Sequence, residues 1–198
     1  EFRDYARLPA AQLNPLDLNA LVAEVLALYG AQQEQGRLQA RLAEGLPLLE
    51  QAVEQSAAMQ IVGHHALWLI HFSEGHWLAG RLDEAAHGAI RALELARAHQ
   101  ERGHQAYALR RLGEVAAHRE PPEIEPAETH YRQAIALAEE LGMRPLLAHC
   151  HLGLGTLYTK VGRLVPARAA LSTAIEIFQA MEMTFWLPRA EAMLAHTE

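Results

Sequence analysis

The sequence predicts an all-α protein, an α-solenoid of antiparallel helical hairpins with about three and a half repeats and a C-terminal capping helix. Alanine and leucine dominate the chain, with Glu and Arg as the main charged residues, which is the composition of packed helices. Apolar residues recur at steps of three and four, so they share one helix face. Similar short strings also recur at intervals of 40 and 42 residues, at 42–45, 82–85, 124–127 and 164–167.

Each of the last three strings begins a predicted helix whose inner face combines small and large residues. These residues are Ala89, Ala92 and Ala96, then Tyr131, Ala134, Ala138 and Leu141, then Leu171, Ala174 and Phe178. Alternating small and large side chains allow helices to pack closely. We place Pro126 and Pro166 at the first helical position, where a missing N–H is harmless.

A second predicted helix precedes each of these strings, and it carries a small residue at a constant place. Ser73, Gly113 and Gly155 recur at intervals of 40 and 42. For the middle hairpin we predict antiparallel helices over 104–118 and 126–141. Gly80 and Gly162 are suited to the turns of the outer hairpins, and residues 120–123 form a longer connector in the middle one. The capping helix is expected over 183–196, beginning late or bending at Pro188.

These residues resemble the tetratricopeptide pattern. Leu154, Gly155 and Tyr158 match its first helix, and Ala167 and Ala174 match its second, although the period exceeds the usual length of about 34. More narrowly, residues 134–155 are similar to the C-terminal repeats of bacterial adenylate/guanylate cyclase proteins, which also carry a cyclase domain and an ATPase domain. The resemblance covers residues 40–198. It implies a regulatory or protein-contact tail of a larger bacterial signalling protein.

Residues 1–39 form a separate segment that does not follow the repeat. Residues 2–9 and 15–29 resemble the linker between the dimerisation helices and the ATP-binding domain of bacterial sensor histidine kinases. A natural gene fusion, a chimera and a coincidence are the three explanations. Kinase activity is not expected, because the nucleotide site of those kinases needs asparagines and none follows Asn19. We expect a helix over 18–29, capped by Asp17, to cover Leu46, Leu49 and Ala52.

Composition and charge argue against several classes of partner. The formal net charge of −7 is unfavourable for a broad nucleic-acid footprint. No stretch of 18 uncharged apolar residues is present to span a membrane. Cys150 is the only cysteine, so no disulfide forms within the chain, and we expect a cytoplasmic protein.

The histidines and Cys150 do not combine into a recognisable catalytic or metal site. His71 and His76 are five residues apart, which turns them away from each other on a helix. His149 and His151 flank Cys150 but diverge in the same way, and a nucleophilic cysteine would need a base held beside it. We therefore predict no catalytic residues, no metal ligands and no cofactor, and we keep a histidine-based enzyme or metalloprotein as the weakest alternative.

The repeat register predicts instead a groove that binds a protein or peptide segment. Its candidate residues are Leu67, Ile70, Glu74, Trp77, Tyr107, Arg110, Arg111, Glu114, His149, Leu152, Thr156, Thr159 and Lys160. Aromatic residues and two arginines on one face suit a peptide with an acidic feature. The alternative is a structural role, either as a homodimer or packed against a cyclase, ATPase or kinase domain.

Overall fold

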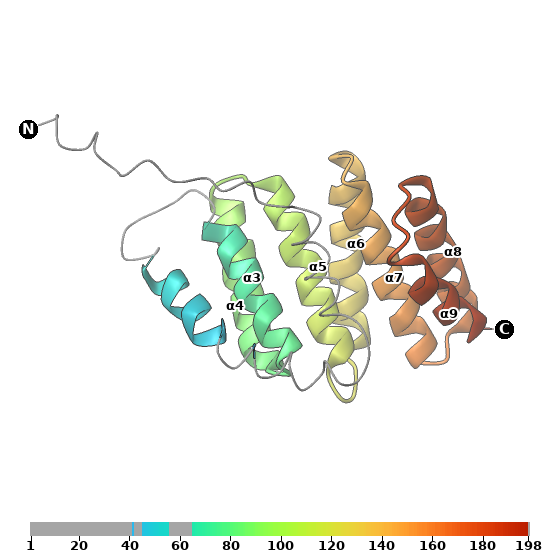
Figure 1. Ribbon diagram of the computed structural model, residues 1–198, viewed down its shortest axis with the longest axis horizontal. Helices are drawn as coiled ribbons and strands as arrows, with labels where there is room; N and C mark the ends of the chain where they lie inside the picture. The colour runs from blue at the N-terminus through green and yellow to red at the C-terminus, as the bar shows by residue number, and fades with distance from the viewer. Residues whose placement is uncertain (1–40, 42–44, 56–64, 198) are drawn as a thin grey trace, which may run out of the picture. The chain divides into compact units, whose positions relative to one another are not determined.

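The computed structural model describes residues 41, 45–55 and 65–197, and every regular element in this part of the chain is a helix (Figure 1). The chain divides into two units, Glu1–Arg41 and Leu42–Glu198, and the description below concerns the second. After a helix over 45–55, seven helices follow: α3 (His65–Leu78), α4 (Leu82–Ala98), α5 (Arg102–His118), α6 (Ile124–Glu140), α7 (Arg144–Lys160), α8 (Leu164–Ala180) and α9 (Leu187–Ala195).

Neighbouring helices pack against one another along the whole series. The tightest pairs are the hairpins α3–α4, α5–α6 and α7–α8, and each hairpin also packs on the next through α4–α5, α6–α7 and α8–α9 (Figure 1). The first helices of successive hairpins are in contact too, α3 with α5, α5 with α7, and α7 with α9. The predicted all-α class, with neighbouring helices packed side by side, is confirmed. In this part of the chain no helix is both long enough and apolar enough to cross a bilayer.

The recurring small residues lie where the two helices of each hairpin approach most closely. A Cβ added to Gly113 would lie 3.0 Å from the ring of Tyr131, and one added to Gly155 would lie 2.5 Å from Leu171 Cγ. In the first hairpin the Ser73 hydroxyl instead donates a hydrogen bond to the Ala85 carbonyl oxygen at 2.6 Å. The intervals of 40 and 42 residues therefore mark one steric requirement met three times.

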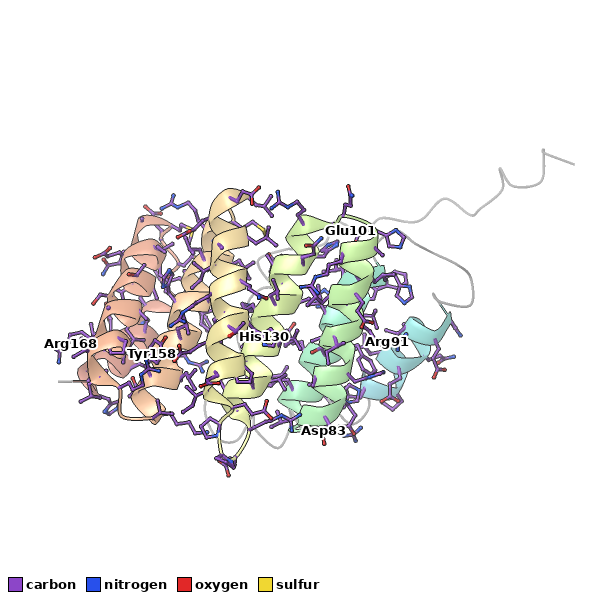
Figure 2. The ribbon with its side chains drawn as sticks, turned by 180° about the vertical axis from the view of Figure 1, so that it is seen from behind. Asp83, Arg91, Glu101, His130, Tyr158 and Arg168 are labelled. Atoms are coloured by element: carbon purple, nitrogen blue, oxygen red, sulfur yellow. The ribbon has the colours of Figure 1, made fainter. Side chains whose placement is uncertain are left out.

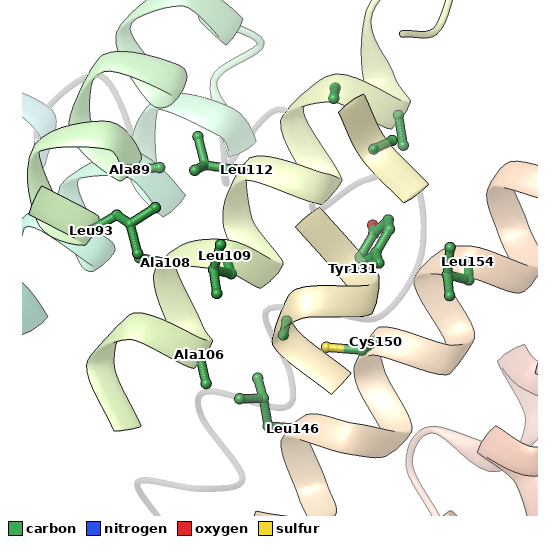
Figure 3. Packing of buried hydrophobic residues seen from close by; sticks show 14 of the residues in the cluster. Ala89, Leu93, Ala106, Ala108, Leu109, Leu112, Tyr131, Leu146, Cys150 and Leu154 are labelled. Carbon is green, nitrogen blue, oxygen red and sulfur yellow. The ribbon is translucent and has the colours of Figure 1, made fainter. Parts of the chain in front are cut away.

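The second helices contribute a seam of small, fully buried residues to the core. Two sets of equivalent positions in α4, α6 and α8 are occupied by alanines that are 0% exposed. The first set is Ala85, Ala127 and Ala167, and the second is Ala92, Ala134 and Ala174. Larger side chains fill the space between hairpins, among them Tyr131 and Leu154 (Figure 3). Because the seam residues are small, the backbones come close and the larger residues interlock beside them.

Several predicted element boundaries need correction. Pro126 and Pro166 are the third residues of α6 and α8, not the first, since both helices begin two residues earlier. The position is still tolerated because N–H groups of the first turn have no acceptor within the helix. The capping helix α9 begins at Leu187, which leaves Pro188 in its first turn.

The connections between helices follow the predicted pattern. Gly80 and Gly162 adopt positive φ angles of 75° and 74° between the helices of the outer hairpins. In the middle hairpin α5 ends at His118 and α6 begins at Ile124, so residues 120–123 lie in the longer connector.

The predictions for residues 1–39, including the helix over 18–29, lie outside the described residues. Within the described part, the helix over 45–55 packs against α3. Its Leu46 and Leu49 side chains reach within 3.0 and 3.4 Å of where a Cβ on Gly75 would be, and Leu46 is 4% exposed. Glu50 Oε1 lies 3.3 Å from His76 Nε2 on α3, and Val53 belongs to the main core.

Candidate functional site

Residues related by the repeat intervals lie on the first helices of the three hairpins, which contact one another in series. Intervals of 40 and 42 residues relate Glu74 of α3 to Glu114 of α5 and Thr156 of α7, and these helices are in contact, α3 with α5 and α5 with α7. We call the predicted groove residues of these three helices the α3–α5–α7 face. It comprises Leu67, Ile70, Glu74, Trp77, Tyr107, Arg110, Arg111, Glu114, His149, Leu152, Thr156, Thr159 and Lys160. The second helices carry other side chains, such as Arg91 on α4, His130 on α6 and Arg168 on α8 (Figure 2).

Four charged side chains of α3 and α5 form one ion-pair network on this face. Arg111 bridges the two equivalent carboxylates, with Nη2 at 2.8 Å from Glu74 Oε1 and Nη1 at 2.6 Å from Glu114 Oε2. Arg110 Nη1 donates to Glu114 Oε1 at 2.9 Å. Because Arg111 is 2% exposed, its charge is compensated inside the protein, as a buried guanidinium requires. The network joins the first hairpin to the second.

Aromatic rings extend the network along the two helices. The guanidinium carbon of Arg111 lies 5.3 Å from the centre of the Trp77 ring, within range of a cation–π interaction. The His118 ring meets Trp77 edge-on at 5.0 Å, and His118 Nδ1 donates to the Glu114 carbonyl oxygen at 2.8 Å. Tyr107, one turn before Arg111 on α5, is 38% exposed. The ionic part of the face is therefore bordered by an accessible aromatic ring.

The network keeps the Glu74 carboxylate ionised. The largest effect comes from the His71 side chain, whose Nδ1 lies 3.7 Å from Glu74 Oε2. Burial acts in the opposite direction, and the positive charges of Arg111 and Arg110 add to the effect of His71. Together they lower the pKa of Glu74 to about 2.

The α7 part of the face has a different chemistry. The hydroxyl of Thr156 donates to the Leu152 carbonyl oxygen at 2.8 Å, and that of Thr159 donates to the Gly155 carbonyl oxygen at 2.9 Å. Lys160 is exposed at the end of the helix. The α7 part therefore presents hydroxyl groups already used as donors and one accessible cation.

His149 of α7 is enclosed by aromatic rings from the C-terminal elements. Its ring meets Trp186 edge-on at 4.6 Å and Phe178 of α8 at 5.3 Å. Burial, followed by the positive charges of Arg110 and Arg189, lowers the pKa of His149 to about 4, while Glu74 acts in the opposite direction. His149 is therefore a neutral, packed ring at neutral pH.

The structure brings some of the predicted groove residues together and assigns others to the core. Glu74, Trp77, Arg110, Arg111 and Glu114 interact directly. Ile70 and Leu152 are 4% and 7% exposed, so their side chains are covered by the protein itself. The rest of the face is only partly covered or exposed, as is the case for Leu67, Tyr107, His149, Thr156, Thr159 and Lys160.

Sequence reasoning missed two histidines that contact the network. His71 lies three residues before Glu74, and His118 lies four residues after Glu114. Both spacings place a side chain on the face of its neighbour, so helical spacing was a signal that could have found them.

The nucleophile considered from the sequence is not activated in the structure. Cys150 is fully buried, and burial raises the pKa of its thiol to about 12, so the thiolate does not form at neutral pH. Its neighbour His149 packs on aromatic rings instead. His71 and His76 differ in their burial, since His71 is exposed whereas His76 is 1% exposed. Across 45–55 and 65–197, no group of three or more His, Cys, Asp or Glu side chains is placed to hold a metal ion.

Comparison with known proteins adds no further identification, because no model of a protein family and no curated protein matches the chain.

Proposed function

We propose that this chain is a non-catalytic protein-interaction module, a helical-repeat solenoid of the tetratricopeptide type, which holds a peptide segment against the α3–α5–α7 face. The repeat type is supported by the small residues Ser73, Gly113 and Gly155 and by the alanine seam, which recur with the same intervals and the same packing role. Because residues 134–155 resemble the C-terminal repeats of bacterial cyclase–ATPase proteins, we propose that the chain is a regulatory tail of a cytoplasmic signalling protein.

The observation that carries the proposal is the accessible mixture of side chains that three separate helices present on one face. Tyr107 is 38% exposed, the Glu74 side chain is 41% exposed, and Lys160 is exposed. Aromatic rings next to charged and hydroxyl groups supply apolar contact area together with directional polar contacts, which is what peptide recognition uses. The full burial of Cys150 and the packed state of His149 favour a binding role over a nucleophilic one.

A peptide-display experiment tests the proposal. A phage library of random 12-residue peptides is selected on the full chain, and the dissociation constants of enriched peptides are measured by fluorescence anisotropy. We expect Tyr107→Ala to weaken binding at least fivefold, because an aromatic anchor at an interface is usually worth about 1 kcal/mol or more. Ile90→Ala is the matched control, since Ile90 is similarly exposed, at 46%, but lies on α4.

Two results contradict the proposal. Selection could enrich no peptide above a protein-free surface, or Tyr107→Ala and Ile90→Ala could weaken binding equally, which would place the contact elsewhere.

A structural role through self-association is the second candidate, and one apolar surface favours it. Leu164 and Val165 are adjacent at the start of α8 and are 43% and 82% exposed. Multi-angle light scattering at rising protein concentration distinguishes the candidates, since a dimer dissociated by Val165→Glu would support self-association. A monomer at every concentration would contradict the self-association candidate.

A further inference from the structure

The α7–α8 hairpin is poor in acidic residues. Asp and Glu outnumber Lys and Arg in the whole chain, 24 to 17, yet residues 141–175 contain neither Asp nor Glu. The same stretch includes the basic residues Arg144, Lys160, Arg163 and Arg168. A carboxylate that compensates these charges has to come from another element of the chain or from another molecule.

One carboxylate of α6 supplies part of that compensation. Glu128 Oε1 accepts a hydrogen bond from Nη1 of Arg163, and Glu128 Oε2 accepts one from Nη2 of Arg132 at 2.7 Å. Two guanidinium groups thus converge on the two oxygens of one carboxylate, which leaves an excess of one positive charge. Glu125 and Lys160 are exposed, lie three residues from Glu128 and Arg163, and add one charge of each sign, so the excess is unchanged.

The ring of Tyr158 holds both guanidinium groups in place as well. The guanidinium carbon of Arg163 lies 4.8 Å from the centre of this ring, and Arg132 Nη2 donates to the Tyr158 hydroxyl at 3.4 Å. Side chains that are already ordered lose little conformational freedom when a ligand binds, which favours affinity. We call Arg132 and Arg163 the arginine pair.

The cations of this group are more accessible than its carboxylate. The side chains of Arg132 and Arg163 are 63% and 49% exposed, whereas that of Glu128 is 12% exposed. The hydrogen bonds to Glu128 and Tyr158 use Arg163 Nη1 and Arg132 Nη2, so Nε and the other Nη of each guanidinium can donate to a ligand. A partner that approaches therefore meets N–H donors that carry a net positive charge.

Two exposed apolar side chains follow the arginine pair directly in the chain. Leu164 and Val165, the first residues of α8, are 43% and 82% exposed. Since they come immediately after Arg163, cationic and apolar surface lie within one helical turn. This mixture suits a segment of a protein, because a free inorganic anion would use the cations and leave the apolar surface in water.

We infer that the arginine pair, with Leu164 and Val165, is a docking surface for an acidic segment of a partner protein. An Asp or Glu side chain of that segment binds the two guanidinium groups, and a neighbouring apolar side chain covers Leu164 and Val165. One carboxylate balances the excess positive charge and can accept hydrogen bonds from both arginines. None of these residues belongs to the α3–α5–α7 face, so the inference goes beyond the proposed function and does not depend on it.

A second copy of the chain fits this surface less well than an acidic partner does. Most dimers have two-fold symmetry, which brings the same surface patch of both copies together. Such a dimer would place two arginine pairs, each with an excess positive charge, at one interface, and like charges there oppose association. Charge complementarity therefore favours a different, acidic partner.

The test titrates three 12-residue peptides into the nitrogen-15-labelled full chain and follows its backbone amides by NMR at low salt. The peptides are Gly–Ser sequences with a central Glu-Leu-Leu-Glu, Gln-Leu-Leu-Gln or Lys-Leu-Leu-Lys. We expect the Glu peptide to shift the amide signals of residues 163–165. Its dissociation constant should be about fivefold lower than that of the Gln peptide, the effect of one partly exposed ion pair, and the Lys peptide should bind most weakly.

Variants separate the charged and apolar parts of the surface. Arg132→Gln should bring the Glu peptide to the level of the Gln peptide, because it removes the excess charge while Glu128 stays paired with Arg163. Val165→Ser should weaken the Glu and Gln peptides by the same factor, about threefold, since it removes apolar area and no charge.

Arg81→Gln is the matched control for the charge variant. Arg81 is exposed and stands immediately before α4, as Arg163 stands immediately before α8, so its replacement should leave the order of the three peptides unchanged. Circular dichroism of each variant checks that the helices persist.

Several results would overturn the inference. The Glu and Gln peptides could bind equally, or no peptide could shift any amide. Inorganic phosphate at the same concentration could shift residues 163–165 as much as the Glu peptide does, with Val165→Ser without effect, which would make the arginine pair a general anion site. A dimer that Val165→Glu dissociates would show that a second copy covers this surface.

The site of the shifts distinguishes this inference from the proposed function. If the Glu peptide shifts the amides around Tyr107 and leaves residues 163–165 unchanged, the peptide binds the α3–α5–α7 face, and the second docking surface is wrong while the proposed function gains support. If the shifts fall on residues 163–165 and peptide selection yields no binder that depends on Tyr107, the inference holds and the proposed function fails.

Discussion

The two ends of the α3–α5–α7 face stand at equivalent repeat positions but hold together by different chemistry. At the α3–α5 end, Arg111 joins the carboxylates of two hairpins in an ionic network. At the α7 end, the position 42 residues after Arg111 is Gly153, and the position 42 residues after Tyr107 is His149, which packs on Trp186 and Phe178. Positions related by the same sequence interval are therefore held by different interactions at the two ends.

Tyr131 explains why the ionic network does not extend to α7. This ring is 1% exposed, and a Cβ on Gly153 would lie 2.5 Å from its Cζ and hydroxyl oxygen. The tip of Tyr131 thus occupies the space that a side chain at position 153 would need. At position 153 of α7, the ring of Tyr131 from α6 therefore takes the place that the Arg111 side chain has at the equivalent position of α5.

Arg111→Ala should produce the largest effect, because it removes the centre of the ionic end. The variant leaves Glu74 and Glu114 without their shared cation, and breaking a buried ion pair usually costs 3–5 kcal/mol. Since Glu74 is partly exposed, we expect the free energy of unfolding to fall by about 3 kcal/mol, measured by urea denaturation followed by circular dichroism.

A matched arginine tests whether this loss comes from the bridge. Arg91→Ala removes an exposed arginine of α4 and should change the free energy of unfolding by less than about 0.5 kcal/mol. If Arg111→Ala were as mild as Arg91→Ala, the network would not join the first two hairpins.

Gly153→Ala should have the next largest effect, because it challenges the packed end at the position equivalent to Arg111. The added methyl group overlaps the buried tip of Tyr131, and forcing an extra group into a filled core usually costs about 1–3 kcal/mol. We expect a loss of about 2 kcal/mol in the free energy of unfolding, measured in the same way.

Gly103→Ala provides the control for glycine in a helix. The nearest atoms to a Cβ at this position of α5 belong to Met143, at 4.0 Å, so the methyl group fits. Alanine favours helix over glycine, and the variant should gain about 0.5–1 kcal/mol. A neutral or stabilising Gly153→Ala would show that Tyr131 can move and would remove our explanation for the end of the network.

Much of the fold could be predicted from the sequence because it depends on steric rules that act locally. A helix pair that approaches closely needs a small residue, so Ser73, Gly113 and Gly155 reveal the hairpins without any structure. A left-handed turn favours glycine, so Gly80 and Gly162 mark the turns between the two helices of the first and third hairpins. The helix starts near Pro126 and Pro166 were misplaced by two residues, because proline is tolerated anywhere in a first turn.

The state of the face depends on tertiary neighbours, which the sequence does not display. Helical register brings Arg110 and Arg111 to one surface, but it does not say that Arg111 is covered while Glu74 stays accessible. That difference arises because the Arg111 side chain reaches from α5 to Glu74 and to the Trp77 ring of α3. Register likewise cannot tell that Ile70 and Leu152 are covered by neighbouring helices, since burial depends on the element that packs on top.

His149 gives the last of these effects, and it sharpens the contrast through pH. Its pKa lies at about 4 in the folded protein against an ordinary value of 6.5, so the unfolded chain binds more protons between these values. Its contribution to stability is therefore complete above pH 6.5 and is lost as the pH falls towards 4. We expect this loss to reach about 2 kcal/mol between pH 7 and pH 4, less than the full shift would give because the ring is partly exposed.

His149→Phe removes the titrating group and keeps a ring against Trp186 and Phe178. The free energy of unfolding of this variant, measured by urea denaturation at intervals between pH 7 and pH 4, should fall less steeply than that of the wild type. Burial also lowers the pKa values of His130 and His151, but both residues are present in both proteins and cancel in the difference. His87→Asn, at an exposed position of α4, should follow the wild-type curve. Parallel curves for His149→Phe and the wild type would mean that His149 titrates as it does in the unfolded chain, and the aromatic end would then not exclude its charged form.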